Sequence, residues 1–216
     1  MIRFLNVARQ FNGRQGIASI TFTIERGEFV LLSGPSGAGK TTILRLIYLD
    51  LFPDSGQIII ENQLLPSRRT RMIPWFRRRI GIVFAEARLL SDRSIFDNVA
   101  LPLRIIGERG RRISRQVNRL LFRFGLKDRS RAFPAELSSG EQKKVAIARA
   151  LSTRPYILLA DEALSNIDPE TSVEILEHLR QVNMEGTTIL AATHIPQPFE
   201  GIARRTLHFR AGKLIS

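Results

Sequence analysis

The sequence contains no cysteine, and none of its apolar runs approaches the length of about 18 residues that a membrane-spanning helix needs. The absence of cysteine excludes disulfide bonds, thiolate nucleophiles and cysteine-ligated zinc or iron–sulfur sites. The first residues, Met1 to Val7, alternate like a strand and lack the long apolar stretch of a signal peptide. We therefore expect a cytosolic chain.

Lysine is also scarce, because 28 of the 33 basic residues are arginine. Residues 68–131 hold 18 basic and 5 acidic side chains, a surplus that equals the net charge of +13 for all 216 residues. A biased base composition accounts for the choice of arginine over lysine, but not for its confinement to one segment. Nucleic-acid binding is disfavoured, since no helix-turn-helix, zinc or aromatic-interleaved strand motif accompanies the charge.

The order of apolar patterns is that of an α/β protein. Strand patterns cover residues 2–7, 17–24, 29–32, 58–60, 80–84, 156–160, 187–193, 205–209 and 213–215, and helical patterns cover 40–51, 94–151 and 169–185. No internal repeat or linker interrupts them. We expect one α/β domain with a helical insertion that carries much of the arginine.

A glycine-rich loop between the third strand pattern and the first helix carries the clearest chemical signal. Residues 34–41, GPSGAGKT, match G-x-x-x-x-G-K-[ST]. Glycines let backbone N–H groups turn toward a phosphate, and the following helix N-terminus adds partial positive charge. We predict phosphate contacts from Gly34, Pro35, Ser36, Gly37, Ala38, Gly39, Lys40, Thr41 and Thr42, with Lys40 on the β- and γ-phosphates and Thr41 on Mg²⁺.

Two adjacent carboxylates, Asp161 and Glu162, end the buried strand pattern 156–160. In a parallel sheet this end faces the ligand crevice. An Asp-Glu pair alone is more often a turn or a helix cap. Combined with the phosphate loop, it indicates that Asp161 holds Mg²⁺ and Glu162 polarises the attacking water.

A serine–glycine turn, Leu137 to Gln142, opens a helix between these two motifs. Ser138 followed by Glu141 is also an ordinary capping box. The order of the three motifs, rather than this turn alone, carries the functional interpretation.

With these motifs in order, the chain resembles the nucleotide-binding subunits of ABC ATPases over nearly its whole length. Residues 34–41 resemble the Walker A loop, 137–142 the signature segment and 157–162 Walker B, while 165–168 resemble the D-loop. His194 is similar to the switch histidine, and Phe11 stands where the family places an aromatic side chain on adenine.

The resemblance implies an ABC-type P-loop NTPase core with an N-terminal antiparallel β subdomain and an inserted helical subdomain. The single domain would comprise a core of about 1–86 and 155–216, with helical residues of about 87–154. It also implies an ATP-dependent homodimer with ATP and Mg²⁺ as cofactors. Glu162, His194 and Lys40 would act in catalysis, and the opposite copy would supply Ser138, Ser139, Gly140, Glu141 and Asp168.

More narrowly, residues 1–4, 77–84 and especially 88–103 resemble the cell-division branch of this family. That branch implies an integral membrane partner, a peripheral position on the cytoplasmic face of the membrane at the septum, and regulation of septal peptidoglycan hydrolysis. Two alternatives stay open: the ATPase subunit of a lipoprotein-release or efflux transporter, and a nucleotide-gated regulatory binder with little hydrolysis.

Three positions depart from the family pattern. Ala85, followed by Glu86, stands where the family has the Q-loop glutamine, so we expect slow hydrolysis or altered coupling. Ser139 replaces the first of two glycines and crowds the approach to a partner's γ-phosphate. Ala163 replaces a proline, which we expect to matter less.

The basic segment has an expected place in this fold, on the face that docks the membrane partner in ABC ATPases. We expect it to meet anionic lipid headgroups or acidic partner residues through Arg68, Arg69, Arg71, Arg77, Arg78 and Arg79.

Overall fold

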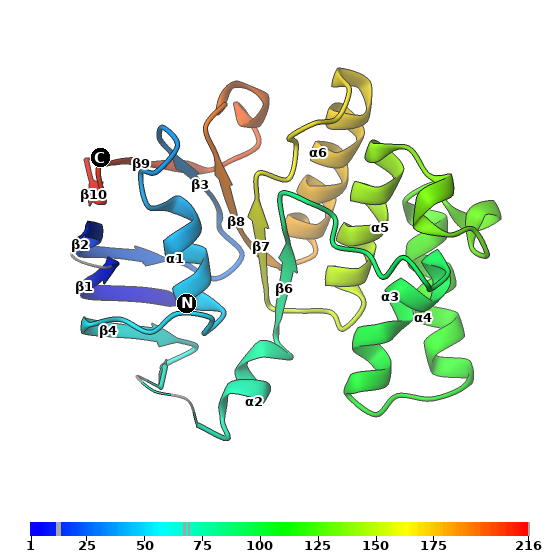
Figure 1. Cartoon of the computed structure of the whole chain (residues 1–216), viewed down its shortest axis with the longest axis horizontal. Coiled ribbons are helices and arrows are strands. Elements are labelled where there is room, and N and C mark those ends of the chain that lie inside the picture. The colour runs from blue at the N-terminus through cyan, green and yellow to red at the C-terminus, as the bar shows by residue number, and fades with distance from the viewer. Residues whose placement is uncertain (12–13, 67, 69, 216) are drawn as a thin grey trace.

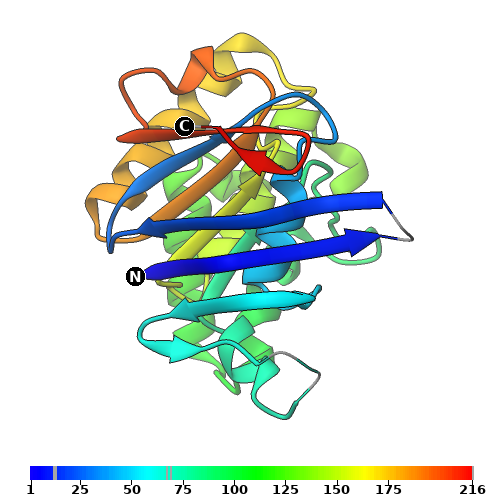
Figure 2. The ribbon, with the colours of Figure 1, turned by 90° about the vertical axis from the view of Figure 1, so that its left-hand side faces the viewer.

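Two β-sheets frame the fold in the computed structural model, which describes residues 1–11, 14–66, 68 and 70–215 (Figures 1 and 2). The first sheet is antiparallel with strand order β2-β1-β4-β5. Its strands are β1 (Ile2–Phe11), β2 (Arg14–Ile24), β4 (Ser55–Ile60) and β5 (Gln63–Leu64). Arg69 of the predicted docking face lies outside the described residues.

The second sheet has the order β10-β9-β3-β8-β7-β6 and is parallel except for the β9–β10 hairpin. Its strands are β3 (Phe29–Ser33), β6 (Ile80–Val83), β7 (Ile157–Asp161), β8 (Thr188–Thr193), β9 (Arg205–Arg210) and β10 (Lys213–Leu214). Because β3, β8 and β7 are central and covered on both faces, they consist almost entirely of apolar residues.

Helices fill the space between the sheets and cover the outer face of the parallel sheet. The α-helices are α1 (Lys40–Ile47), α2 (Ile73–Arg77), α3 (Ile95–Ile105), α4 (Arg111–Arg123), α5 (Ser139–Leu151) and α6 (Pro169–Met184). Short 3-10 turns cover Lys127–Arg129, Pro134–Glu136 and Gln197–Phe199. Helix α1 lies between the sheets, α5 and α6 lie on the other side, and α3 and α4 form the far end (Figure 1). None of the helices in these ranges has the length and apolar character that crossing a bilayer requires.

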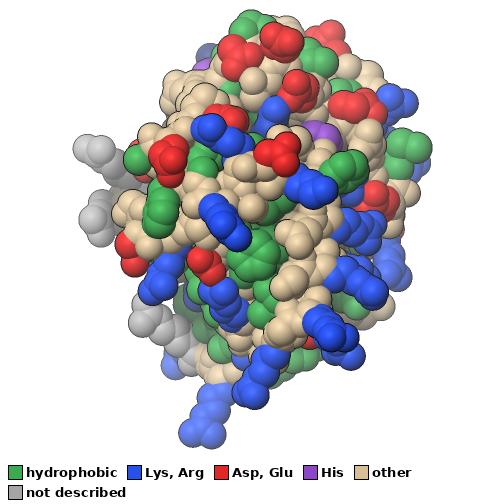
Figure 3. Space-filling view, turned by 90° about the vertical axis from the view of Figure 1, so that its right-hand side faces the viewer, with side chains coloured by type: hydrophobic (Ala, Val, Ile, Leu, Met, Phe, Trp, Pro, Cys, Tyr) green, Lys and Arg blue, Asp and Glu red, His purple; other side chains and the backbone are tan. Residues whose placement is uncertain are grey.

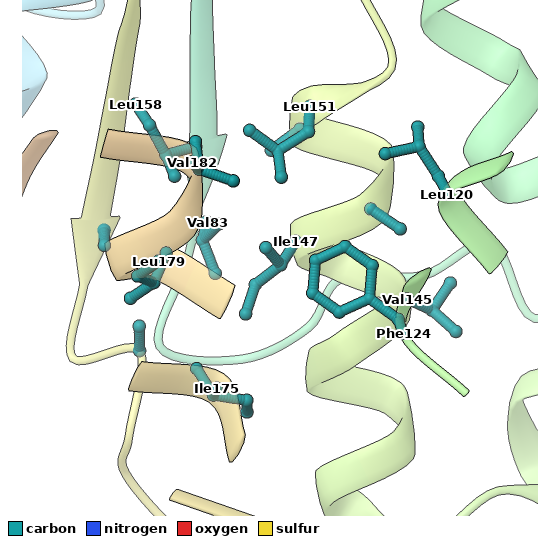
Figure 4. Close-up of a cluster of buried hydrophobic side chains, with 14 of the residues drawn as sticks. Val83, Leu120, Phe124, Val145, Ile147, Leu151, Leu158, Ile175, Leu179 and Val182 are labelled. Atoms are coloured by element: carbon teal, nitrogen blue, oxygen red, sulfur yellow. The ribbon is translucent and has the colours of Figure 1, made fainter. Parts of the chain in front are cut away.

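The parallel sheet divides the interior into two apolar clusters. Successive residues of a strand point to opposite faces, so Val30 and Leu32 of β3 join α1 and the antiparallel sheet. Phe29 and Leu31 join the cluster with α3 to α6, part of which Figure 4 shows. Both clusters therefore share the same strands as a common wall.

The first helix begins at Lys40 as predicted but ends at Ile47 rather than at 51. Leu49 takes a left-handed conformation, with φ of 63°. The guanidinium of Arg77, on α2, donates to the carbonyls of Tyr48 and Leu49 at 3.1 Å each. The predicted end was wrong because the chain leaves the helix at Leu49, and the N–H groups of Asp50 and Leu51 both donate to the carbonyl of Arg45 instead of continuing the helical bonds.

Other boundaries also differ from the predicted ones. Strand β1 extends to Phe11, and β4 begins at Ser55. The short elements β5 and α2 were not predicted, and the helical region 94–151 divides into three α-helices with two 3-10 turns between them. The division into a core and a helical subdomain at about 87 and 154 stays a prediction.

Candidate functional site

The phosphate loop, residues 34–41, joins β3 to α1 in a backbone shape that requires glycine. Gly34, Gly37 and Gly39 have φ of 151°, 77° and 103°. A Cβ at Gly34 would lie 2.1 Å from the carbonyl oxygen of Phe209 on β9. The N–H of Gly212, in the turn between β9 and β10, donates to the carbonyl of Ala38 at 3.2 Å. The loop is thus shaped before any ligand arrives, with the N-terminus of α1 at its mouth.

Lys40 lies at the centre of this loop and is only 6% exposed. Its Nζ donates to the carbonyls of Gly34 at 2.6 Å and Pro35 at 3.1 Å. Burial lowers the pKa of Lys40, while the carboxylates of Glu162 and Asp161 oppose that shift. The side chain therefore places a positive charge inside the loop, next to the two acids.

A cavity of about 440 Å³ opens over the loop. It is lined by Phe11, Gly16, Glu162 and the consecutive residues 36–42, which include every predicted phosphate-binding residue except Gly34 and Pro35. Sequence reasoning missed Gly16. A Cβ there would lie 2.6 Å from the ring of Phe11, so the glycine gives the aromatic ring its place. The glycine lies inside β2, which begins at Arg14 rather than at the predicted residue 17, so the sequence pattern did not mark it as a strand glycine.

Asp161 and Thr41 meet at the end of β7. The Thr41 hydroxyl donates to Asp161 Oδ1 at 3.0 Å. Burial raises the pKa of Asp161, and neighbouring Glu162 raises it further, while the Thr41 hydrogen bond opposes both.

Two hard oxygen donors suit Mg²⁺, which usually takes one or two carboxylates together with phosphate and water oxygens. Within the described ranges no group of three or more His, Cys, Asp and Glu side chains could hold an ion by itself. Thr41 and Asp161 therefore fit an ion that arrives with a phosphate ligand.

Glu162 follows β7 directly, with a left-handed φ of 47°. Its Oε1 lies 3.0 Å from Nδ1 of His194, and its Oε2 accepts from the hydroxyl of Thr193 at 3.3 Å. An ionised carboxylate only accepts, so Nδ1 of His194 carries a proton in this contact. Thr193, which sequence reasoning missed, thus helps to orient the carboxylate. A strained backbone at the end of a buried strand is typical of functional sites.

The signature segment, residues 137–142, lies elsewhere. Ser138 Oγ accepts from the N–H of Glu141 at 3.2 Å, and the Glu141 carboxylate accepts from the N–H of Ser138 at 2.8 Å. The capping box is therefore real, and it starts α5. Ser139 is exposed, whereas Gly140 is buried against Thr171 of α6.

Asp168 caps the neighbouring helix α6 by accepting from the N–H of Thr171 at 2.8 Å. The predicted partner-facing residues Ser138, Ser139, Gly140, Glu141 and Asp168 thus gather at the N-terminal ends of α5 and α6. None of them lines the cavity over the phosphate loop. One chain therefore presents two separate groups of site residues.

The three departures occupy different surroundings. Ala85 and Glu86 are exposed in the segment after β6. Ala163 is 2% exposed and belongs to the apolar cluster under α6.

Comparison with known proteins gives a consistent result. The profile described as ABC transporter matches residues 17–165. The chain is 37% identical to the cell division ATP-binding protein FtsE of Streptococcus pneumoniae, covering 100% of this chain and 94% of the relative. The protein of the same name from Mycobacterium tuberculosis is 41% identical with 100% and 94% coverage, and that from Escherichia coli is 43% identical with 90% and 88% coverage.

Solved structures agree with the sequence comparisons. The chain matches a dimeric post-hydrolysis state of the ATP-binding cassette MJ0796 bound to ADP and Pi, with a TM-score of 0.92 and 29% identity, over 100% of this chain and 97% of the other. It also matches cbiO1 of Clostridium perfringens, with a TM-score of 0.92 and 28% identity, over 100% and 86%. The predicted fold class is confirmed.

Proposed function

The chain belongs to the ABC transporter family of ATP-binding cassettes, and from that premise we propose that it is the ATP-binding and ATP-hydrolysing subunit of a cell-division complex with an integral membrane partner resembling FtsX. One observation carries the enzymatic part. The buried ammonium of Lys40, the Asp161–Thr41 oxygen pair and the oriented carboxylate of Glu162 meet at one phosphate loop. The cell-division role is supported by the full-length relatives that bear that name.

Each residue of the site would have a distinct role in ATP binding and hydrolysis. Phe11 would stack on adenine, the loop N–H groups would hold the phosphates, and Lys40 would neutralise charge on the β- and γ-phosphates. Glu162 would accept a hydrogen bond from the attacking water. Mg²⁺, held by Thr41 and Asp161, would supply further neutralisation of phosphate charge when bound. His194 would contact the γ-phosphate while keeping Glu162 in place.

The second group of residues would complete the site from another copy of the chain. Two copies facing head to tail would bring Ser138, Gly140 and Asp168 of one over the phosphate loop of the other, so ATP would join them. Hydrolysis would then release the contact, which shifts the population from closed to open dimer. The solved relative MJ0796 is dimeric and holds ADP and Pi.

Substitution of Glu162 by glutamine tests this mechanism. The amide can still accept from His194 but is a poor base, so phosphate release should fall about 100-fold or more. ATP should then accumulate a dimer that light scattering detects, whereas His194→Ala should lose hydrolysis without trapping the dimer as strongly. A Glu162→Gln protein that stays monomeric at saturating ATP would contradict the mechanism. Background phosphate release from the unmodified chain, with and without its partner, would favour the nucleotide-gated binder instead.

An apolar groove of about 560 Å³ would receive a cytoplasmic segment of the membrane partner. Residues of α2, β6, α3 and α5 line it, and the lining includes Ile82, Leu101, Pro102, Ile105 and Ile106 together with Arg77 and Arg78. Figure 3 shows Lys and Arg side chains gathered over the lower half of the far end of the molecule, around exposed hydrophobic atoms. An apolar helix with acidic flanks is the complementary partner surface.

Not every arginine predicted for this face is free to bind a partner. Arg77 is engaged with the carbonyls of Tyr48 and Leu49, and Arg79 lies over the ring of Trp75 at 3.6 Å. Reversal of Arg77 or Arg79 would disturb the fold as well as the surface. Exposed Arg78 is the cleaner position to change.

Arg78→Glu should reduce the recovery of the membrane partner from detergent-solubilised membranes. Arg210→Glu is the control of equal charge, because Arg210 is exposed on β9 at the opposite end of the molecule. Equal recovery with both variants would remove the electrostatic docking proposal. Identification of the co-purified membrane protein also separates the cell-division role from lipoprotein release or efflux. Binding to anionic vesicles without the partner tests lipid contact, and a fluorescent fusion tests the predicted septal location.

A further inference from the structure

Helix α5 holds the segment Phe84 to Arg88, here called the 84–88 segment, with two cationic side chains. Lys143 Nζ donates to the carbonyl of Phe84 at 3.2 Å and also to that of Ala85. The guanidinium of Arg149 donates to the carbonyls of Ala87 and Arg88 at 2.8 Å each. Four of the five carbonyls in the segment are thus bound by two side chains of one helix.

Lys143 is an unusual residue at such a position. It is 3% exposed, and among the described residues no carboxylate forms an ion pair with it. Burial lowers the pKa of Lys143, and Asp161 is the acid that opposes the shift. Two carbonyls replace only part of the hydration that a buried ammonium loses. Stability alone does not favour a charge here, so the side chain needs another explanation.

The position of Lys143 in the fold explains why a buried lysine stands there. It lies five residues after Ser138 and three after Gly140, within the first turns of the same helix. The 84–88 segment continues β6, and Val83 of β6 pairs with Ala160 of β7, the residue before Asp161. Lys143 therefore connects the signature end of α5 directly to the sheet edge that carries the two acids.

The side chains of Ala85 and Glu86 do not anchor the 84–88 segment in the way that Lys143 and Arg149 do. Ala85 has no side-chain donor or acceptor, and both Ala85 and Glu86 are exposed. Arg88 has a left-handed φ of 46° and its guanidinium lies 4.2 Å from the ring centroid of Phe84, so the segment is folded back on itself. Bonds from α5 to its carbonyls fix this shape from outside.

We propose that Lys143 is a positioning residue that ties the 84–88 segment to α5, so that movement of the signature end of α5 is transmitted to the sheet edge at Asp161 and Glu162. Arg149 is the second anchor of the same connection. The proposal rests on the proposed ATPase function for its catalytic consequence, but the tether itself is a property of the chain without ligand.

Lys143→Met tests the tether, because it keeps an unbranched chain and removes both hydrogen bonds. Lys144→Met is the matched control: it removes the same charge one residue later, where the ammonium pairs with Glu174 instead. Hydrogen exchange of peptides covering residues 84–88, measured without nucleotide, should become at least several-fold faster in Lys143→Met and stay unchanged in Lys144→Met.

The catalytic consequence is a fall in kcat without a fall in ATP affinity. Misplacement of site residues by about 1 Å costs up to about 100-fold in rate, so we expect kcat of Lys143→Met to fall 10- to 100-fold while the Kd for ATP stays within about twofold. Lys143→Gln replaces Lys143→Met if the latter does not fold, since its shorter neutral side chain should shift both readouts in the same direction.

The outcomes separate this proposal from the proposed function. A folded Lys143 variant with the exchange and kcat of the Lys144→Met control overturns the positioning role. An unmodified chain that does not hydrolyse ATP overturns the proposed function, and the exchange comparison then still decides whether the tether exists.

Discussion

Substitution of Gly140 by alanine separates two reasons for a glycine at this position. The first is packing inside the chain. A Cβ at Gly140 would lie 2.7 Å from Cγ2 and 3.1 Å from Oγ1 of Thr171, on the facing helix α6. The second is the proposed approach of a partner's γ-phosphate, which any side chain would obstruct.

The structure gives the size of the packing term. Overpacking of a filled contact costs about 1–3 kcal/mol, while alanine gains about 1 kcal/mol over glycine inside a helix. Gly140→Ala should therefore lower the free energy of unfolding by about 0–2 kcal/mol in total. Each kcal/mol lost corresponds to a fall of about 2–4 °C in Tm for a chain of this length. Thr171→Ser removes Cγ2, so it should recover about 1–2 kcal/mol in the Gly140→Ala background through direct coupling.

Urea denaturation of the unmodified chain, both single variants and the double variant measures this coupling, and phosphate release is measured on the same four proteins. If the double variant regains stability but not phosphate release, glycine is needed at the dimer contact. If it regains both, packing is the only reason for glycine. A coupling energy near zero would refute the close contact between the two helices.

Three further outcomes follow from single contacts. Hydrogen bonds from a capping hydroxyl and a guanidinium hold the pKa of Asp97 below its usual value, so its contribution to stability is full above about pH 4 and disappears as the pH falls through that lowered pKa. Asp97→Asn should cost about 0.5–1 kcal/mol at pH 7 and much less at pH 3, as urea melts at both pH values would show. Gly34→Ala should prevent stable folding, seen as lost cooperative melting, because its Cβ would lie 2.1 Å from the Phe209 carbonyl oxygen. Gly16→Ala should displace the ring of Phe11 and raise the KM for ATP about tenfold, in line with a stacking contribution of 1–3 kcal/mol, and an unchanged KM would contradict the adenine platform.

Local signals predicted the features closest to the chemistry. The phosphate loop and the start of α1 at Lys40 were predicted from three closely spaced glycines followed by a lysine and a threonine. The end of β7 at Asp161 follows from an apolar run that only a central parallel strand needs. In both places the signal lies within a few residues of the sequence, although the predicted structure also packs against distant residues such as Phe209 and Gly212.

The features that could not be predicted from the sequence depend on contacts between residues far apart in the chain. Arg77 of α2 binds the carbonyls that follow α1, the position of Phe11 depends on Gly16 across a strand pair, and Glu162 is oriented by Thr193 as well as His194. The capping box at Ser138 was visible in the sequence, but its distance from the phosphate loop was not, because that depends on how α5 packs against the sheet.

The contact between the phosphate loop and the β9–β10 hairpin has a consequence for biosynthesis. Gly34 packs against Phe209, and Gly212 bonds to both Ala38 and Ala18. The loop leaves the ribosome long before its supports, and at about 5–20 residues per second the delay is roughly 10 to 30 seconds. During that interval the phosphate loop of a growing chain would lack its contacts with Phe209 and Gly212. Nucleotide binding should therefore appear only after residue 212 has emerged, late in the synthesis of each copy.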